Sequence, residues 1–232
     1  MPAPKTARPA EHPVEGFRSA LLPAAPRRPV RVYLRTDYQA KYAYPLVVLF
    51  HAAGESEEQA ARLVPQLSRR NYIALCLRGS VDLGRRADGR PAFGWGGAAA
   101  DRGVKAALAH VRAEYSVHAD RVFLVGIGEG AAAAYQLGLA MGDRAAGVVA
   151  LNGALPNGRV PANRLRVLVS HGTANPVVPV AEARRAAAEL TRAGAAVRVA
   201  RYATAHRVHP DMLADANRWI MAQITAQSGV RE

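Results

Sequence analysis

Residues 121–141 read RVFLVGIGEGAAAAYQLGLAM, and the interpretation of the whole sequence starts from this segment. Four apolar residues at 122–125 precede Gly126, Gly128 and Gly130, and an alanine-rich segment of high helix propensity follows them. An apolar run, closely spaced glycines and a helix-forming segment predict a strand, a sharp turn and a helix. In α/β proteins the turn at the carboxyl end of a strand commonly carries the functional residues.

Two known turns fit this pattern. In a nucleophile elbow, G-x-S-x-G, the turn raises a serine above the sheet edge; residues 126–130 have both outer glycines, with Gly128 at the serine position. In a dinucleotide-binding turn, G-x-G-x-x-G/A, glycines bring the backbone close to a pyrophosphate, and Gly126, Gly128 and Ala131 match that spacing. The second turn also requires an acidic residue about 20 positions later, whereas Asn152 follows the next apolar run. Nucleotide binding is therefore the weaker alternative.

Apolar runs alternate with segments of helical periodicity along the chain. Strands are expected at 30–34, 46–50, 72–77, 122–125, 148–151, 165–170 and 196–202, and helices at 57–69, 104–115, 181–193 and from Pro210 onward. This alternation predicts an α/β fold with a mostly parallel, doubly wound sheet flanked by helices. The loop at 78–97, which contains Phe93 and Trp95, is long enough to suggest a functional role.

The N-terminal segment differs in composition from the rest. Residues 1–28 are rich in proline, alanine and arginine and cannot form a core, so we expect an irregular arm, either disordered or lying over another surface. Residues 29–232 are sufficient for one α/β domain with a full core. The sequence thus predicts one domain preceded by an arm.

The chain is strongly basic, with 31 Lys and Arg residues against 18 Asp and Glu and a formal net charge of +13. The excess is spread over the arm, the loops and the helix faces, which is typical of a solvated surface. A protein or other acidic partner that contacts the basic surface and the arm is the alternative. The sequence contains no known nucleic-acid-binding motif, but nucleic acid stays open as such a partner.

Several other classes of protein do not fit the sequence. It contains neither a signal-peptide h-region nor 18 consecutive apolar residues, so we expect no membrane span. Its single cysteine, Cys76, lies in an apolar run and cannot form an intrachain disulfide, which suits the cytoplasm. The spacing of His, Cys, Asp and Glu predicts no metal site, and no cofactor is expected.

Three further segments carry a resemblance to a known family. Residues 45–51 read PLVVLFH before a GES sequence at 54–56, residues 171–179 read HGTANPVVP, and Ala205-His206 precedes the last helix. Together with the elbow they make residues 30–225 similar to the α/β-hydrolases, specifically the small carboxylesterase, phospholipase and acyl-protein thioesterase branch with its feruloyl-esterase-like relatives. The resemblance implies an α/β-hydrolase fold and the chain order nucleophile, acid, base.

The resemblance also indicates which catalytic residues are replaced. Gly128 stands where the nucleophilic serine would be and Asn175 where the triad aspartate would be, so only the base, His206, is retained. Glycine has no side-chain oxygen that could form an acyl-enzyme. We expect Asn175 to hold the imidazole in the wrong tautomer and to be unable to stabilise an imidazolium. In serine proteases that replacement lowers turnover about 10⁴-fold.

The remaining site residues implied by the resemblance form an oxyanion loop and a cleft for a small acyl or ester-like ligand. They are His51, Ala52, Ala53, Glu129 and Trp95. Among them His51 is expected to have a structural role.

From these features we predict a catalytically inactive, esterase-like protein, a pseudo-hydrolase, retained as a binding or assembly component. The first alternative is an active carboxylic-ester hydrolase that uses His206 with a non-standard nucleophile or with water activated by Glu55 or Glu129. The second alternative is a nucleotide-binding protein that uses Gly126, Gly128 and Ala131.

Overall fold

The computed structural model describes residues 16–21, 28–35, 37–97 and 101–228. The strands are β1 (Gly16–Leu21), β2 (Pro29–Leu34), β3 (Tyr44–Phe50), β4 (Ile73–Leu77), β5 (Val81–Arg85), β6 (Pro91–Gly94), β7 (Val117–Ile127), β8 (Gly147–Leu151), β9 (Arg166–Gly172) and β10 (Ala196–Tyr202). The helices are α1 (Glu57–Leu67), α2 (Arg102–Glu114), α3 (Glu129–Met141), α4 (Val180–Arg192) and α5 (Pro210–Ser228), with a 3-10 turn, η1, at Gly142–Arg144.

Eight of the strands form one sheet in the order β1-β2-β4-β3-β7-β8-β9-β10. Strand β2 is antiparallel to β1 and to β4, and all other neighbours are parallel. The register aligns Phe50 of β3 with Gly126 of β7, and Gly126 with Ala150 of β8. The carboxyl ends of these strands therefore meet at one edge of the sheet, where such folds place their functional residues.

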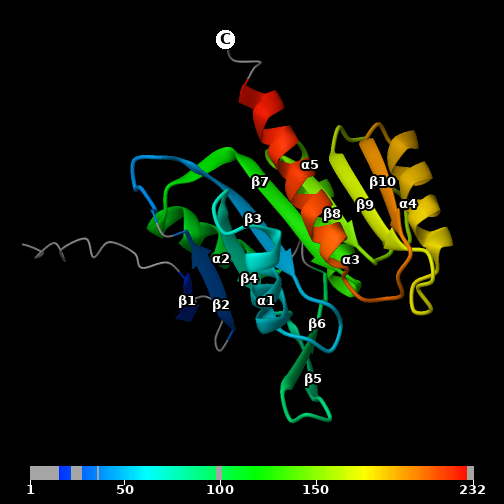
Figure 1. Ribbon diagram of the computed structural model, residues 1–232, viewed down its shortest axis with the longest axis horizontal. Helices are drawn as coiled ribbons and strands as arrows, with labels where there is room; N and C mark the ends of the chain where they lie inside the picture. The colour runs from blue at the N-terminus through cyan, green and yellow to red at the C-terminus, as the bar shows by residue number, and fades with distance from the viewer. Residues whose placement is uncertain (1–15, 22–27, 36, 98–100, 229–232) are drawn as a thin grey trace, which may run out of the picture.

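Helices cover both faces of this sheet (Figure 1). Side chains of α2, α3 and α4 belong to one apolar core, and those of α1 and α5 belong to the core on the opposite face. The central strands are buried on both faces, which explains their continuous apolar sequences: all seven residues of β3 and all five of β4 are buried. The predicted α/β-hydrolase fold, with a mostly parallel sheet flanked by helices, is confirmed.

Two regions differ from the sequence-based expectation. Part of the predicted irregular arm, Gly16–Leu21, forms β1 and pairs with β2 at the edge of the sheet, and Arg28 at the end of the arm donates to the Asp101 carboxylate at 2.7 Å. Residues 1–15 and 22–27 of the arm lie outside the described residues. The predicted long loop at 78–97 contains the β5–β6 hairpin, which projects from the body in Figure 1. Neither strand of the hairpin has the sequence of a buried strand, because all five residues of β5 are exposed and β6 is only four residues long.

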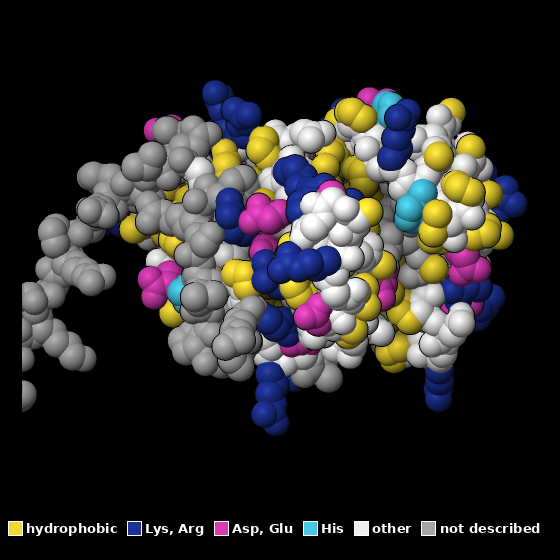
Figure 2. All heavy atoms as spheres, turned by 90° about the horizontal axis from the view of Figure 1, so that it is seen from below, with side chains coloured by type: hydrophobic (Ala, Val, Ile, Leu, Met, Phe, Trp, Pro, Cys, Tyr) yellow, Lys and Arg dark blue, Asp and Glu magenta, His cyan; other side chains and the backbone are white. Residues whose placement is uncertain are grey.

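Charge on the face drawn in Figure 2 is scattered, with Lys and Arg side chains separated by acidic and apolar ones. Within the described ranges, no helix is both long and apolar enough to cross a membrane. The same residues include no group of three or more His, Cys, Asp or Glu side chains placed to hold a metal ion. Cys76 is a buried free thiol.

Candidate functional site

The elbow is formed where β7 passes into α3. Gly128 lies between them with φ 55° and ψ −120°, a conformation that residues with a side chain adopt only under strain. The outer glycines pack closely against backbone, Gly126 against the start of α3 and Gly130 against the end of β3. A Cβ on Gly130 would lie 2.3 Å from the carbonyl oxygen of Phe50, and one on Gly126 would lie 2.2 Å from that of Gly130. Close backbone packing accounts for this spacing without a bound nucleotide.

His206 faces the elbow from the loop between β10 and α5. A Cβ on Gly128 would lie 3.5 Å from Nε2 of His206 and 3.4 Å from Cβ of Ala52, which are ordinary contact distances. The space for a small side chain is therefore present, and the nearest polar atom is the imidazole nitrogen. The structure brings together Gly128 and His206, 78 positions apart in the sequence.

Asn175 lies on the other side of the imidazole. Its Oδ1 is 3.0 Å from Nδ1 of His206, and the same oxygen accepts the backbone N–H groups of Val177 and Val178, each at 3.0 Å. These two backbone donors fix the orientation of the amide, because its nitrogen cannot accept a hydrogen bond. The oxygen of Asn175 therefore faces the two N–H groups and the imidazole of His206. Nδ1 of His206 must then carry the proton and donate to Asn175.

The expectation that Asn175 holds the imidazole in the wrong tautomer is therefore wrong. The two backbone donors leave the amide only one useful orientation, and with Nδ1 protonated, Nε2 presents a lone pair toward Gly128. Asn175 differs from an aspartate in two other respects. It carries no charge to stabilise an imidazolium, and its Nδ2 is buried without a hydrogen-bond partner in the described structure.

The environment of His206 favours the neutral ring. The half-buried position lowers the pKa of His206 by desolvation, and the nearby His171 lowers it further. His171 is fully buried, with Nε2 2.8 Å from the carbonyl oxygen of Val178. At neutral pH His206 is thus an unprotonated base with its lone pair directed at the elbow.

The loop after β3 is held by His51. Nδ1 of this buried ring lies 2.7 Å from the carbonyl oxygen of Ala52, and Nε2 accepts the N–H of Gly79 at 2.8 Å. The N–H of Ala52 is also engaged, since it donates to Oε1 of Gln59 at 2.8 Å. In contrast, the N–H groups of Ala53 and Glu129 have no partner within the described part of the chain.

Trp95, which follows β6, connects the β5–β6 hairpin to the loop after β3. Its Nε1 donates to the carbonyl oxygen of His51 at 3.0 Å, and its ring packs 5.1 Å from that of Phe50 and 5.0 Å from that of His51, measured between centroids. The nearby residue Phe93 lies under the guanidinium of Arg78 at 4.6 Å. The aromatic residues of the 78–97 segment therefore connect it to the sheet.

In the described structure neither candidate carboxylate forms a hydrogen bond or an ion pair with His206. Glu55 is paired with Arg86 of the hairpin and lies 3.6 Å from Arg62 of α1, so two guanidinium groups hold its carboxylate. Glu129 is exposed, and its Oε2 lies 3.3 Å from the Cβ position of Gly94 on the hairpin. The two residues proposed to activate water are thus directed toward the hairpin.

Asn152 is a site residue that the sequence reasoning missed. It is fully buried, has φ 54°, and lies directly after β8. Its Oδ1 accepts the N–H of Gly172 at 2.8 Å, and its Nδ2 donates to the carbonyl oxygen of Arg207 at 2.9 Å. It therefore ties the end of β9 to the loop that carries His206. The available signal was a polar residue directly after a buried strand in a parallel sheet.

Comparisons with known proteins agree with the fold. The sequence profile of the family described as Phospholipase/Carboxylesterase matches residues 34–224. No curated protein sequence matches the chain.

Among solved structures, a Bacillus cereus carboxylesterase is similar with a TM-score of 0.67 at 18% identity, over 85% of this chain and 95% of that one. A Mesorhizobium loti carboxylesterase gives 0.66 at 19%, over 88% and 98%. The α/β hydrolase MGS-M1, from a Medee basin deep-sea metagenome library, gives 0.71 at 15%, over 91% and 99%. At these identities the structural likeness concerns the fold, and the profile match shows the family. The chain belongs to the Phospholipase/Carboxylesterase family of α/β-hydrolases.

Proposed function

We propose that this protein is a pseudo-hydrolase: a family member that has lost ester cleavage and is retained as a binding or assembly component. The observation that carries the proposal is Gly128, which stands at the elbow facing Nε2 of His206 and has no oxygen to attack a carbonyl carbon. The uncharged Asn175 in the acid position supports it, because an amide stabilises a developing imidazolium less than a carboxylate does.

Other features of the site support the proposal that it still binds a ligand although it has lost catalysis. By the resemblance, Ala53 in the loop after β3 and Glu129 next to position 128 correspond to the two backbone donors of an oxyanion hole, and their N–H groups have no partner among the described residues. We assign to them the carbonyl or carboxylate oxygen of a small acyl or ester-like ligand. The basic surface and the N-terminal arm are the proposed contacts for an acidic partner.

Hydrolysis of a short-chain aryl ester tests the loss of chemistry. The protein and its His206→Ala variant are expected to give the same rate, close to that of buffer. Turnover by the unmodified protein that His206→Ala abolishes would overturn the proposal. For the partner, co-purification is compared at low and moderate salt, because an electrostatic partner is released as salt rises.

A second candidate is an active hydrolase in which His206 activates water directly. The tautomer of His206 favours it, since the Nε2 lone pair faces the open side of Gly128. The same assay separates the two candidates, because only this one predicts turnover that depends on His206 while residue 128 is glycine.

A further inference from the structure

A second site is suggested by a groove between α2 and α3, on the sheet face opposite α1 and α5. It has a volume of about 380 Å³. Its lining residues are Lys105, Leu108, Ala109, Arg112, Leu137, Ala140, Met141 and Arg144. Helix α3 begins at Glu129, next to the elbow, and ends at Met141, which lines the groove. The groove therefore lies at the end of α3 that is far from the elbow.

The charge of the groove has one sign. Lys105 and Arg112 project from α2 and Arg144 follows α3; all three are exposed, and in the described structure none of them is paired with a carboxylate. No acidic residue lines the groove; Asp143, next to Arg144, lines a separate pocket. The carboxyl ends of α2 and α3 each contribute only about half a negative charge. The three full positive charges of Lys105, Arg112 and Arg144 exceed these partial charges, so the groove carries a net positive charge.

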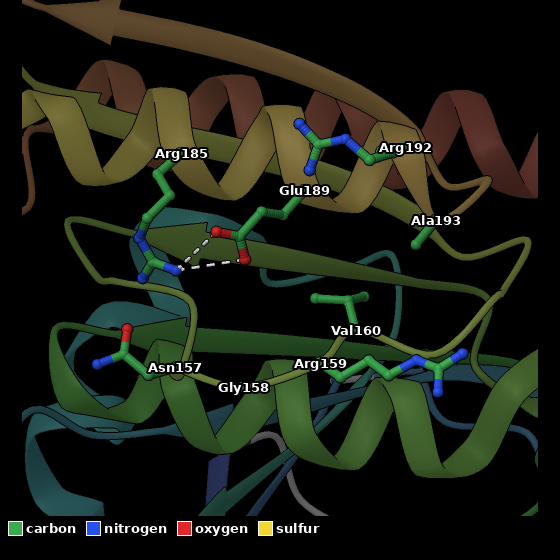
Figure 3. A pocket seen from close by; sticks show the side chains of 8 residues that line it. All are labelled: Asn157, Gly158, Arg159, Val160, Arg185, Glu189, Arg192 and Ala193. Atoms are coloured by element: carbon green, nitrogen blue, oxygen red, sulfur yellow. Dashed lines mark hydrogen bonds and ion pairs between the residues drawn. The ribbon is translucent and has the colours of Figure 1, made fainter.

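The contrast with the pocket in Figure 3 is informative. That pocket lies between α4 and the 157–160 loop, and it also contains arginine side chains. There, however, Arg185 forms ion pairs with Glu182 and Glu189 and donates to the carbonyl oxygen of Leu155. Arg159 and Arg192 of that pocket have no ion pair among the described residues, but the lining also includes the carboxylate of Glu189, whereas no acidic residue lines the α2–α3 groove.

The floor of the groove is apolar. Leu108 and Leu137 form its base with 9% and 4% of their surface exposed, and the half-buried Met141 and the small side chains of Ala109 and Ala140 complete it. An unbranched chain fits such a floor, because small residues leave room beside it and methionine adapts its shape. The volume lies within the usual range for small-molecule sites, roughly 300–1,000 Å³.

From the unpaired cations and the apolar floor we infer that the α2–α3 groove binds a single-chain amphiphile with an anionic head group. The chain lies along Leu108, Leu137 and Met141. The carboxylate or phosphate of the head group is held by the guanidinium groups of Arg112 and Arg144, which donate two parallel hydrogen bonds to such oxyanions. This inference does not depend on whether the elbow is catalytic.

Titration calorimetry with dodecanoate and with dodecyl phosphate, each below the concentration at which it forms micelles, tests this site. We expect one molecule to bind per chain with at least one of the two probes, and the tighter probe identifies the head group. The neutral dodecyl maltoside should bind at least tenfold more weakly. Arg112→Gln/Arg144→Gln should weaken the anionic probe at least tenfold, and Ala140→Trp, which fills the groove without changing its charge, should do the same.

Arg184→Gln/Arg192→Gln is the matched control, because it also removes two positive charges and both residues are exposed arginines on α4, outside the groove lining. It should leave the affinity unchanged. Absence of saturable binding by both anionic probes would overturn the inference. So would equal affinity in the double variant and the control, or binding to anionic vesicles alone. Circular dichroism of each variant establishes that it is folded, so that a loss of binding is not mistaken for unfolding.

Discussion

The imidazole Nε2 of His206 lies 3.5 Å from the point that a Cβ atom on Gly128 would occupy. On its other side, Nδ1 of the same ring is 3.0 Å from Asn175. The base is therefore positioned and in the productive tautomer, while residue 128, which faces it, carries no hydroxyl group. The effect of adding a hydroxyl at position 128 can therefore be measured separately from the effect of adding a negative charge at position 175.

Asn175→Asp is expected to raise esterase turnover only where a nucleophile is present. In a Gly128→Ser background the imidazole already has the correct tautomer, so the added carboxylate contributes mainly by stabilising the imidazolium. The gain should therefore be smaller than the roughly 10⁴-fold effect of this exchange in serine proteases. Aryl-acetate kinetics of the single and double variants measure it. A gain of the full 10⁴-fold would show that Asn175 does not orient His206 as the structure has it.

The elbow glycines should differ in their tolerance of a methyl group. Gly128→Ala should cost about 1–3 kcal/mol, because its Cβ meets only ordinary contacts and the penalty comes from the positive φ. Gly130→Ala should cost more, since its Cβ would lie 2.3 Å from the Phe50 carbonyl oxygen. Urea denaturation compares the free energies of unfolding of the two variants. Equal costs would contradict the close packing of the turn.

Asn152 should matter for the loop that carries His206. Asn152→Gly keeps a residue suited to φ 54° but removes the side chain, so it leaves the Gly172 N–H and the Arg207 carbonyl without their partner. We expect a loss of about 2 kcal/mol or more in unfolding free energy. Asn152→Ala should lose more, because it adds backbone strain. Hydrogen exchange at the 203–209 loop should increase in both, and unchanged exchange there would refute the positioning role.

Stability should fall on mild acidification because of His51. Burial lowers the pKa of His51 below its ordinary value of 6.5, and its Nε2 accepts the Gly79 N–H only while the ring is neutral. The unfolded chain then binds the proton more readily than the folded one, so the unfolding free energy rises with pH up to about 6.5 and falls as the pH drops through the lower folded value.

Urea midpoints at pH 7.5, 6.5 and 5.5 measure this slope. His51→Gln should reduce it, leaving a remainder from His206, whose pKa is also lowered. A slope in the variant as steep as in the parent protein would show that His51 does not carry it.

The sequence predicted most of the fold because its central strands are continuous apolar runs and its helices have regular apolar faces. It did not reveal β1 or the β5–β6 hairpin: β1 is a short edge strand, and all five residues of β5 are exposed, so burial imposes no pattern on it. The positions of Gly128, Asn175 and His206 could be identified by resemblance. The orientation of the Asn175 amide could not, because the N–H groups of Val177 and Val178 that fix it become available only in the folded loop.

Covalent labelling by a fluorophosphonate tests the proposed loss of the nucleophile most directly, since this reagent reacts with an activated hydroxyl beside a histidine base. Mass spectrometry should find no adduct on the unmodified protein and a single adduct in Gly128→Ser, on the peptide that contains position 128. Adding His206→Ala to that variant should abolish the adduct. An adduct on the unmodified protein that His206→Ala removes would mean that another hydroxyl serves as nucleophile, and would contradict the assignment of this protein as a pseudo-hydrolase.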